Sequence, residues 1–322
     1  MAQAQESFTS RGIVADTQRG LLDDPKWLSS LYFYDERGSQ LFEEICATPE
    51  YYVTRTEEAI LREHAAAMVA AAGAGPETPL VVGELGSGSS AKTRVLLQAL
   101  LDAQGPTTYL PVDVSPTILE ETARDLEAAY AGLTVQPLAA EYKDGLDQLG
   151  AAPGRKLILF LGSSLGNFEP NEQLDLLAEA AEVLSPGDAF LLGTDLVKPQ
   201  AVLEAAYDDA AGVTAAFNKN ILAHLNREMD GDADPDAFDH EARWNARRSR
   251  IEMHLVSRRD QHLRFPAAGL EVHVEAGESI HTENSYKFTV DGVRAMAARA
   301  GFTLEQTWTD EQGWFALHLL RV

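Results

Sequence analysis

The sequence predicts an α/β protein built around a parallel sheet, into which a second unit is inserted. From Leu80 to Gly193, apolar strand-like segments alternate with segments of helical periodicity, which is typical of parallel strands joined by helices. The first strand ends in a small-residue turn at residues 86–90, where doubly wound folds bind nucleotides. Residues 196–285 break the alternation, and a helix and two strands then resume it.

Composition limits the classes of function. The chain has 322 residues, enough for one large core or two domains, and its formal net charge is −24, so a nucleic-acid backbone or an anionic membrane would repel it. Cys46 is the single cysteine, which excludes an internal disulfide and a cysteine-held metal. Residues 1–7 lack the apolar core of a signal peptide, and no apolar run could span a bilayer. We expect a cytoplasmic monomer that binds neither nucleic acid nor a membrane.

Aromatic residues precede the first strand. Thr54 and Glu57 have the spacing of a capping box for a helix that Gly73 would end. Tyr51 and Tyr52 lie immediately before that helix. Such residues can fill a core or line a polar pocket, and the sequence leaves both possibilities open.

The first turn, after the strand Leu80–Val82, indicates a particular kind of nucleoside. Its glycines, Gly86 and Gly88, form a G-x-G pattern without a third glycine, and no Gly-Lys-Ser/Thr follows. This argues against a nicotinamide dinucleotide and against a phosphate loop. Glu84, an acid before the first glycine, favours a cationic ligand without phosphate, namely S-adenosylmethionine. A purely structural turn is an alternative of similar weight. The following helix is expected to be capped by Ser89 or Ser90.

The second strand, residues 108–114, carries an acid at its end. Asp113 stands where a carboxylate can accept hydrogen bonds from both hydroxyls of a ribose. The alternative is that Asp113 caps the next helix.

The remaining elements follow in order. Further strands are predicted at residues 133–138, 156–161, 189–193, near 304 and at 314–322, with helices at 171–184 and 290–300. The strand at 156–161 is almost wholly apolar, which predicts burial on both faces.

An acidic segment has the spacing of a calcium loop, but its chemistry is wrong for one. Its carboxylates are Asp230, Asp232, Asp234, Asp236 and Glu241. The sixth loop position needs a positive φ and is normally glycine, whereas Pro235 stands there. A solvated acidic loop is expected, and no metal site.

Several separated motifs together resemble a known family, the S-adenosylmethionine-dependent L-histidine Nα-methyltransferases of ergothioneine biosynthesis. The motifs are FYDERGS (33–39), PEYYVTRTE (49–57), ELGSG (84–88), FLGSSLGN (160–167), LGTDLVK (192–198), residues 207–220, RIEM (250–253) and TENSYKF (282–288). The resemblance implies a class I methyltransferase Rossmann-like sheet with an inserted second α+β substrate domain. The cofactor-binding domain would comprise residues 62–195 and 286–322, and the substrate-binding domain residues 10–61 and 196–285.

The resemblance also implies the cofactor contacts. These are Gly86, Lys92, Asp113, Glu141 and Tyr142. Glu141 stands where the family usually has an aspartate. The cofactor would be S-adenosylmethionine.

For the amino-acid end of the substrate, the resemblance implies two groups. Tyr51, Tyr207 and the backbone of Gly162 would bind the carboxylate. Tyr34 and Asn167 would face the α-amine as the catalytic residues. The implied reaction transfers three methyl groups to the α-amine of L-histidine and gives the betaine hercynine.

The imidazole contacts would be Glu283 and Ser285, with Met253 against the ring. Two alternatives remain: a methyltransferase acting on another amino acid such as tryptophan, or a non-catalytic cofactor-binding protein. Glu283 argues against the first alternative, since a carboxylate suits an imidazole with two N–H donors. The joint presence of Tyr34, Asn167 and Glu283 argues against the second.

Overall fold

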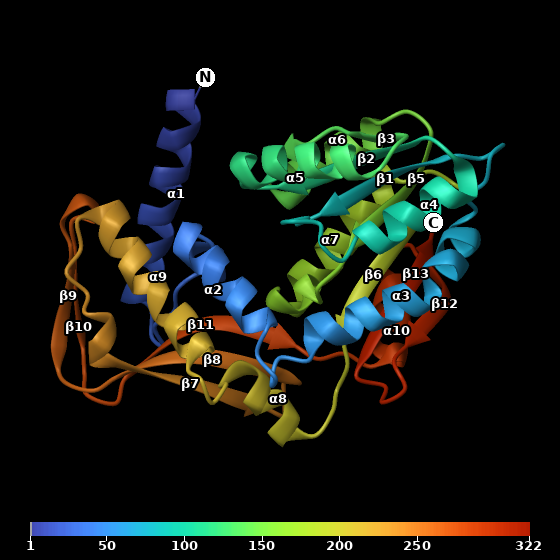
Figure 1. The fold of residues 1–322 in the computed structure, drawn as a ribbon. Coiled ribbons are helices and arrows are strands. Elements are labelled where there is room, and N and C mark those ends of the chain that lie inside the picture. The colour runs from blue at the N-terminus through green and yellow to red at the C-terminus, as the bar shows by residue number, and fades with distance from the viewer. Residues whose placement is uncertain (1) are drawn as a thin grey trace. The chain divides into compact units, whose positions relative to one another are not determined.

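The computed structural model describes residues 2–322, with side chains from Gly12 onward, and the chain divides into two compact units. Unit 1 contains the residues up to Tyr52 together with Lys198–Tyr286, and unit 2 contains Val53–Val197 with Lys287–Val322. Figure 1 shows the strands and helices of each unit in the colour order of the chain.

Unit 2 is organised around a mixed sheet. Its strands are β1 (Leu80–Leu85), β2 (Thr107–Asp113), β3 (Leu133–Val135), β4 (Leu138–Ala139), β5 (Arg155–Phe160), β6 (Ala189–Asp195), β12 (Thr303–Thr309) and β13 (Phe315–Arg321). The order across the sheet is β12-β13-β6-β5-β1-β2-β3, and β4 also pairs with β2. Neighbours from β6 to β3 run parallel, whereas β13 is antiparallel to both of its neighbours. The prediction of a parallel sheet closed by two terminal strands is confirmed.

The helices of unit 2 pack on this sheet in the doubly wound manner. They are α3 (Val53–Ala72), α4 (Arg94–Gln104), α5 (Pro116–Ala129), α6 (Tyr142–Ala151), α7 (Pro170–Val183) and α10 (Val290–Arg299). α3 packs against α4, while α7 packs against both α6 and α10 (Figure 1). The central strand β6 is buried along its whole length, and β5 is buried from Lys156 to Phe160, so the predicted burial of the 156–161 strand is confirmed.

Local sequence explains where several of these helices begin. α5 starts after Ser115, whose side chain accepts a hydrogen bond from the Ile118 N–H, with Pro116 at the first helical position. α7 starts with a capping box between Glu169 and Glu172. α4 differs from the expectation: Thr93 occupies its N-cap position, and neither Ser89 nor Ser90 does.

Unit 1 combines helices with antiparallel strands. Its helices are α1 (Ala2–Leu22), η1 (Ser30–Phe33), α2 (Glu36–Cys46), α8 (Gln200–Tyr207), α9 (Val213–Met229), η3 (Pro235–Ala237) and η4 (Pro266–Ala268). Its strands are β7 (Phe238–Asn245), β8 (Arg250–Ser257), β9 (Gln261–Phe265), β10 (Leu270–Val274) and β11 (Ser279–Tyr286). One sheet has the order β11-β8-β7, and β9 and β10 form a separate hairpin.

A bulge in β11 decides which side chains face the interior of unit 1. The register shifts between His281 and Glu283, so that His281 pairs with His254 and Glu283 pairs with Met253. His254 and Met253 are successive residues of β8 and point to opposite faces of the sheet. Thr282 is therefore the extra residue, and the bulge turns Glu283 away from the face that carries His281.

The boundaries expected after residues 195 and 285 lie within two residues of the unit boundaries, whereas the first expected boundary does not. The boundary expected after residue 61 lies inside α3, and the whole of α3 belongs to unit 2, where it packs on α4 and β13. The assignment of cofactor and substrate binding to separate domains remains a prediction.

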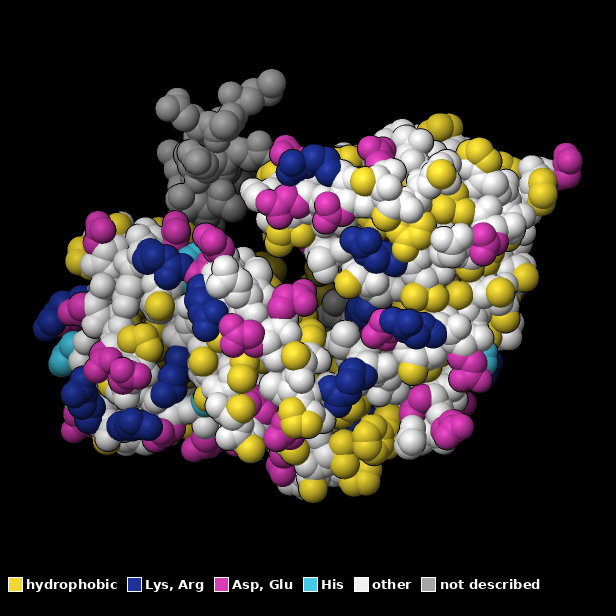
Figure 2. Space-filling model, in the orientation of Figure 1, with side chains coloured by type: hydrophobic (Ala, Val, Ile, Leu, Met, Phe, Trp, Pro, Cys, Tyr) yellow, Lys and Arg dark blue, Asp and Glu magenta, His cyan; other side chains and the backbone are white. Residues whose placement is uncertain are grey.

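The surface on the side shown in Figure 2 carries acidic and basic side chains next to one another. Among the residues that the structure describes, no helix combines the length and the apolar character needed to cross a membrane.

Candidate active site

The turn after β1 has a backbone that only glycine adopts readily. Gly86 has φ +64° and Gly88 has φ +49°, both in the left-handed region. A Cβ on Gly86 would lie 3.0 Å from the Tyr142 hydroxyl oxygen, so the ring of Tyr142 lies directly over the turn. The glycines therefore provide both the turn and the close approach of neighbouring groups.

Asp113 holds this turn from the end of β2. Its Oδ2 accepts a hydrogen bond from the Gly88 N–H at 2.9 Å, and its Oδ1 accepts from the Ser115 N–H at 3.0 Å. Ser115, not Asp113, caps α5, so the helix-cap alternative for Asp113 is wrong. Burial, and then the charge of Asp113, raises the pKa of Tyr142 to about 12. Gly86, Asp113 and Tyr142 thus form one cluster of the predicted cofactor contacts.

The other two predicted cofactor residues lie differently. Glu141 is exposed at the N-cap position of α6 and makes no side-chain capping bond there. Lys92 forms an ion pair with Glu57, a fully buried carboxylate on α3.

Glu84 has a structural role that the sequence argument did not predict. Its carboxylate is 4% exposed and accepts hydrogen bonds from Thr93 Oγ1 at 2.7 and 2.8 Å and from the Tyr109 hydroxyl. Burial raises the pKa of Glu84 to about 7. The chain's own hydroxyls therefore occupy the carboxylate that was expected to favour a cationic ligand. Ser90, the other expected cap, instead bonds to the Tyr109 hydroxyl at 2.8 Å.

Glu57 determines what the Gly162 backbone can offer. The two carboxylate oxygens of Glu57 accept the Gly162 N–H at 2.8 and 3.0 Å. The remaining polar group of Gly162 is its carbonyl, an acceptor, which repels a carboxylate. The Gly162 N–H is thus paired within the chain, and the contact between the Gly162 backbone and the substrate carboxylate remains a prediction.

The sequence pattern assigned Glu57 to a capping box, and no local signal revealed its other role. Gly193 on β6 supplies a spatial signal, because a Cβ there would lie 2.4 Å from Glu57 Oε1. Only the folded sheet brings α3, β6 and the turn after β5 together.

Asn167 ends a short helical turn, η2 (Ser164–Asn167), at the carboxyl end of β5. Ser163, which precedes the turn, has φ 58°, and its Oγ accepts the Asp195 N–H at 2.9 Å. This bond ties the turn to the end of β6. Asn167 therefore lies on a fixed turn at the edge of the sheet where open α/β folds bind ligands.

Several predicted substrate contacts come together within unit 1. The rings of Tyr51 and Tyr207 meet edge to face with centroids 6.1 Å apart, and the Tyr207 hydroxyl bonds to Ser285 Oγ at 2.7 Å. Burial raises the pKa of Tyr51 well above its ordinary value, and the neighbouring Tyr207 and Glu283 act in the same direction. The Tyr51 phenol thus keeps its proton at neutral pH and can donate a hydrogen bond.

Glu283 and Met253 are paired across β11 and β8. Glu283 is 9% exposed and Met253 is 1% exposed. Glu283 is therefore a buried carboxylate and not an exposed surface acid. A thioether and a carboxylate side by side offer a planar cationic ring an apolar wall and an acceptor.

Tyr34 is more exposed than the other predicted substrate-binding and catalytic residues. It is 46% exposed, and its ring packs edge to face on Phe42 and Phe217, each at 5.8 Å between centroids. These contacts fix the ring while leaving part of it accessible.

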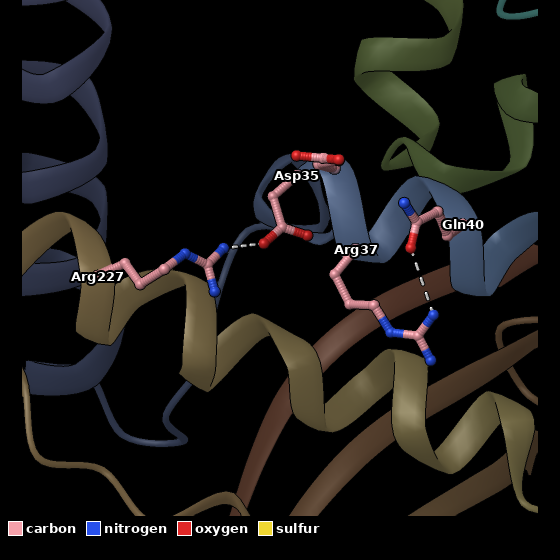
Figure 3. Close-up of a pocket in the computed structure, with 5 residues that line it drawn as sticks. Asp35, Arg37, Gln40 and Arg227 are labelled. Atoms are coloured by element: carbon pink, nitrogen blue, oxygen red, sulfur yellow. Dashed lines mark hydrogen bonds and ion pairs between the residues drawn. The ribbon is translucent and has the colours of Figure 1, made fainter.

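An open hollow of about 330 Å³ lies at the start of α2, lined by Asp35, Glu36, Arg37, Gln40 and Arg227 (Figure 3). Arg227 pairs with Asp35, which also accepts the Gly38 N–H at 2.7 Å and the Asn220 side-chain amide at 2.7 Å. None of the predicted site residues lines the hollow, and Asp35 serves there to join α2 to α9.

The acidic segment is held by ion pairs. Asp232 pairs with Arg264 at 3.3 Å and Asp234 with Arg259 at 3.1 Å. Within the described part of the chain, no group of three or more His, Cys, Asp or Glu residues is placed to hold a metal ion.

Two features define the class of protein. The antiparallel strand β13 lies between β6 and β12 in a doubly wound sheet, and an acid at the end of β2 holds the glycine turn after β1. Together they define a class I S-adenosylmethionine-dependent methyltransferase. The family of histidine-specific, S-adenosylmethionine-dependent methyltransferases matches residues 13–322, and the chain belongs to this family.

Named relatives agree with this family. A histidine N-alpha-methyltransferase of Mycolicibacterium smegmatis is 46% identical over 94% of this chain and 93% of the relative. The Mycobacterium tuberculosis protein of the same name is 44% identical over the same shares. Ergothioneine biosynthesis protein 1 of Neurospora crassa is 37% identical over 63% of this chain and 23% of its own length. A solved methyltransferase from Streptomyces caelestis shares 15% identity, with a TM-score of 0.46, over 86% of this chain and 98% of that chain.

Proposed function

We propose that this protein transfers three methyl groups from S-adenosylmethionine to the α-amine of L-histidine, giving the trimethyl betaine hercynine as a step of ergothioneine biosynthesis. The family match and the two mycobacterial relatives support histidine as the substrate. The observation that carries the proposal is the buried Glu283, turned by the bulge of β11 to the same face as Met253. An imidazolium is the amino-acid side chain that such a pair suits best.

The residues around the turn after β1 fit the cofactor. Gly86 and Gly88 leave room for a ligand to approach the backbone, and Asp113 has acceptor capacity for ribose hydroxyls beyond its two backbone bonds. Tyr142 covers the turn, and Glu141 precedes Tyr142 in the chain. Lys92, which pairs with Glu57, would supply a cation for the carboxylate of the cofactor. When bound, the cofactor supplies an electrophilic methyl group.

Tyr51 and Tyr207 would bind the substrate carboxylate through their hydroxyl groups. Both phenols lie in one buried cluster, and the raised pKa of Tyr51 keeps its proton in place as a hydrogen-bond donor. A charged acceptor bound by neutral donors gives stronger hydrogen bonds than a neutral pair.

Glu283 and Ser285 would bind the imidazole, with Met253 against the ring. Glu283 accepts from a ring N–H, and Ser285, whose Oγ lies 2.7 Å from the Tyr207 hydroxyl, can accept from the other. An indole has one N–H and no positive charge, so the buried carboxylate disfavours the tryptophan alternative.

Tyr34 and Asn167 would act on the α-amine. The attacking amine must be neutral, so its proton must leave through Tyr34 or a water molecule. Asn167 accepts a hydrogen bond from the amine as long as an N–H remains. A trimethylated nitrogen has no N–H left, so the product loses this contact, which gives a physical stop after three transfers.

Mass spectrometry tests the proposal directly. The purified protein is incubated with S-adenosylmethionine and each standard amino acid in turn, and the products are resolved by the number of methyl groups added. We expect histidine to give mono-, di- and trimethyl species, with the last accumulating. Methylation of tryptophan but not histidine would establish the alternative substrate, and no product from any amino acid would overturn the proposal.

We further propose that the protein is a cytoplasmic monomer. Its net charge of −24 supports the monomer, because like charges oppose self-association. Light scattering at physiological salt measures the molar mass, and a value of twice 35.0 kDa would contradict a monomer.

A further inference from the structure

A continuous series of hydrogen bonds runs through the interior of unit 1, across β11, α9, β7 and α8. Thr282 Oγ1 lies 2.7 Å from Asn218 Oδ1, and Asn218 Nδ2 lies 2.8 Å from His240 Nδ1. His240 Nε2 in turn lies 2.8 Å from the carbonyl oxygen of Tyr207. Asn218 is 0% exposed and Thr282 is 1% exposed. Three side chains thus connect β11 to α9, β7 and α8, which precede it in the chain.

The chemistry of the acceptors fixes the direction of every bond in this series. The Tyr207 carbonyl can only accept, so His240 carries its proton on Nε2. Neutral His240 then accepts at Nδ1 from the Asn218 amide. The second N–H of that amide donates to the His254 carbonyl at 3.1 Å, which excludes a flipped Asn218 side chain. Thr282 donates to the remaining Asn218 oxygen.

The two ends of the series lie at two parts of the proposed substrate site. Thr282 is the bulge residue of β11, and the bulge is what turns Glu283 and Ser285 to the inner face of the sheet. Tyr207 is the last residue of α8 and offers its hydroxyl to the substrate carboxylate. The series therefore connects the groups that would bind the ring to a group that would bind the carboxylate.

We propose that Thr282, Asn218 and His240 are positioning residues that fix the distance between the carboxylate-binding and ring-binding groups, and so select an amino acid of the length of histidine. The proposal rests on the proposed function, because it assigns these groups to the two ends of one substrate. None of the three residues needs to touch the substrate. Their effect is on geometry, and a small displacement of a binding group is costly.

The series also requires neutral His240. A proton on Nδ1 would face the Asn218 amide N–H groups, and the His254 carbonyl prevents the amide from turning over. Burial lowers the pKa of His240; Asp208 and Asp209, which precede α9, oppose this shift, and Lys219 on α9 reinforces it. Acidification should therefore disturb the position of Tyr207.

Two substitutions of His240 separate its two bonds. In His240→Gln the amide nitrogen can replace Nε2 and keep the bond to the Tyr207 carbonyl, whereas His240→Asn reaches only the position of Nδ1. We expect His240→Asn and Asn218→Ala to raise KM for histidine about tenfold, the factor that corresponds to about 1.4 kcal/mol, with KM for S-adenosylmethionine unchanged. His240→Gln should retain most of the wild-type affinity.

The preference for histidine over a longer amino acid is a second measurement, and a loss of stability would not change it. Homohistidine places one more methylene between the α-carbon and the ring, and an extra methylene in a fitted pocket changes kcat/KM about 10- to 200-fold. We expect the preference of the wild-type protein for histidine over homohistidine to fall about tenfold in Asn218→Ala.

Asn226→Ala is the matched control. Asn226 lies on the same helix, and its side chain makes two backbone hydrogen bonds, both to Ala233, at 2.7 and 3.0 Å. It should lower the melting temperature without changing either KM or the length preference. If wild-type protein methylates histidine and Asn218→Ala changes neither quantity, the positioning role is overturned. If wild-type protein does not methylate histidine, the proposed function itself has failed.

Discussion

At the scale of single residues, the proposed role of Glu283 in substrate choice can be tested by substitution. Glu283 is 9% exposed and beside Met253, so an apolar ring bound there would offer this buried carboxylate no hydrogen-bond donor. Truncating one partner of a buried charged pair typically costs about 2–5 kcal/mol. Glu283→Ala should therefore lose most of its activity on histidine and little on tryptophan, where the desolvation cost of the carboxylate disappears. The ratio of kcat/KM for the two amino acids, in both proteins, is the measurement.

The same kinetic measurements can also contradict the prediction. If the ratio does not move toward tryptophan, Glu283 does not bind the ring. A variant that loses activity on both substrates equally would indicate damage to the fold, which a melting curve with and without S-adenosylmethionine would detect.

The raised pKa of Glu84 predicts that it makes the protein less stable as the pH rises. Its pKa is raised from 4.5 to about 7 by burial, so the folded state holds the proton more tightly than the unfolded state. Proton binding by Glu84 contributes about 3 kcal/mol to the free energy of unfolding. This contribution is full below pH 4.5 and is lost as the pH rises through 7. Glu84→Gln should thus become more stable relative to the wild type as the pH rises from 5 to 8. Urea unfolding at several pH values measures this difference, and a constant difference would exclude titration of Glu84 in this range.

At the scale of elements, the glycine turn after β1 combines two constraints at one residue. Gly86 has φ +64°, and its missing Cβ leaves room for the Tyr142 hydroxyl. Gly86→Ala should lower the affinity for S-adenosylmethionine by about 1 kcal/mol or more, since alanine strains the left-handed backbone and displaces Tyr142. Calorimetric titration with the cofactor measures the loss. Gly105→Ala is the control, because Gly105 also has a positive φ of 83° but ends α4 with no atom within 4 Å of its Cβ position. Equal cofactor affinity in the Gly86 variant and the wild type would contradict the role of the turn.

The bulge in β11 is the corresponding element in unit 1. Strict alternation would place His281, Glu283 and Ser285 on one face. The extra residue instead leaves His281 opposite His254 and brings Glu283 beside Met253. A bulge therefore separates a pair of histidines on one face from the proposed substrate groups on the other.

At the scale of the whole molecule, buried histidines should control stability in acid. His318 in β13 is 0% exposed, lies between hydroxyls of Thr194 and Thr307 at 2.9 and 3.0 Å, and has its pKa lowered to about 4 by burial and then by Arg294. In the unfolded chain His318 binds a proton near pH 6.5. The neutral ring therefore contributes about 3 kcal/mol to the free energy of unfolding above pH 6.5, and this contribution is lost as the pH falls toward 4.

His318→Gln isolates this effect. The variant should be less stable than the wild type at pH 7, and the difference should shrink between pH 6.5 and 4. Urea unfolding across this range measures it. The trend is opposite in sign to that of Glu84, so the two variants distinguish the two groups. Parallel curves for His318→Gln and the wild type would show that His318 does not titrate as the structure implies.

The sequence alone determined the architecture of the sheet and the glycine turn, because these depend on local patterns. Alternation of apolar strands with helices and the small residues at 86–90 are readable without a fold. The motifs around Tyr51, Asn167 and Glu283 also identified the family before any contact was known. In contrast, the pattern could not show that β3 and β4 divide one expected strand, since that depends on pairing with β2.

Only the tertiary structure decided how the polar groups are paired. Glu57 has the spacing of a helix cap, yet it is buried against Gly162 and Lys92, and Glu84 bonds to hydroxyls rather than facing a ligand. The bulge at Thr282 and its connection through Asn218 to His240 join segments up to 64 residues apart. A buried hydrogen-bonding group must find its partner wherever the folded chain brings one, and that partner is set by long-range packing rather than by neighbours in sequence.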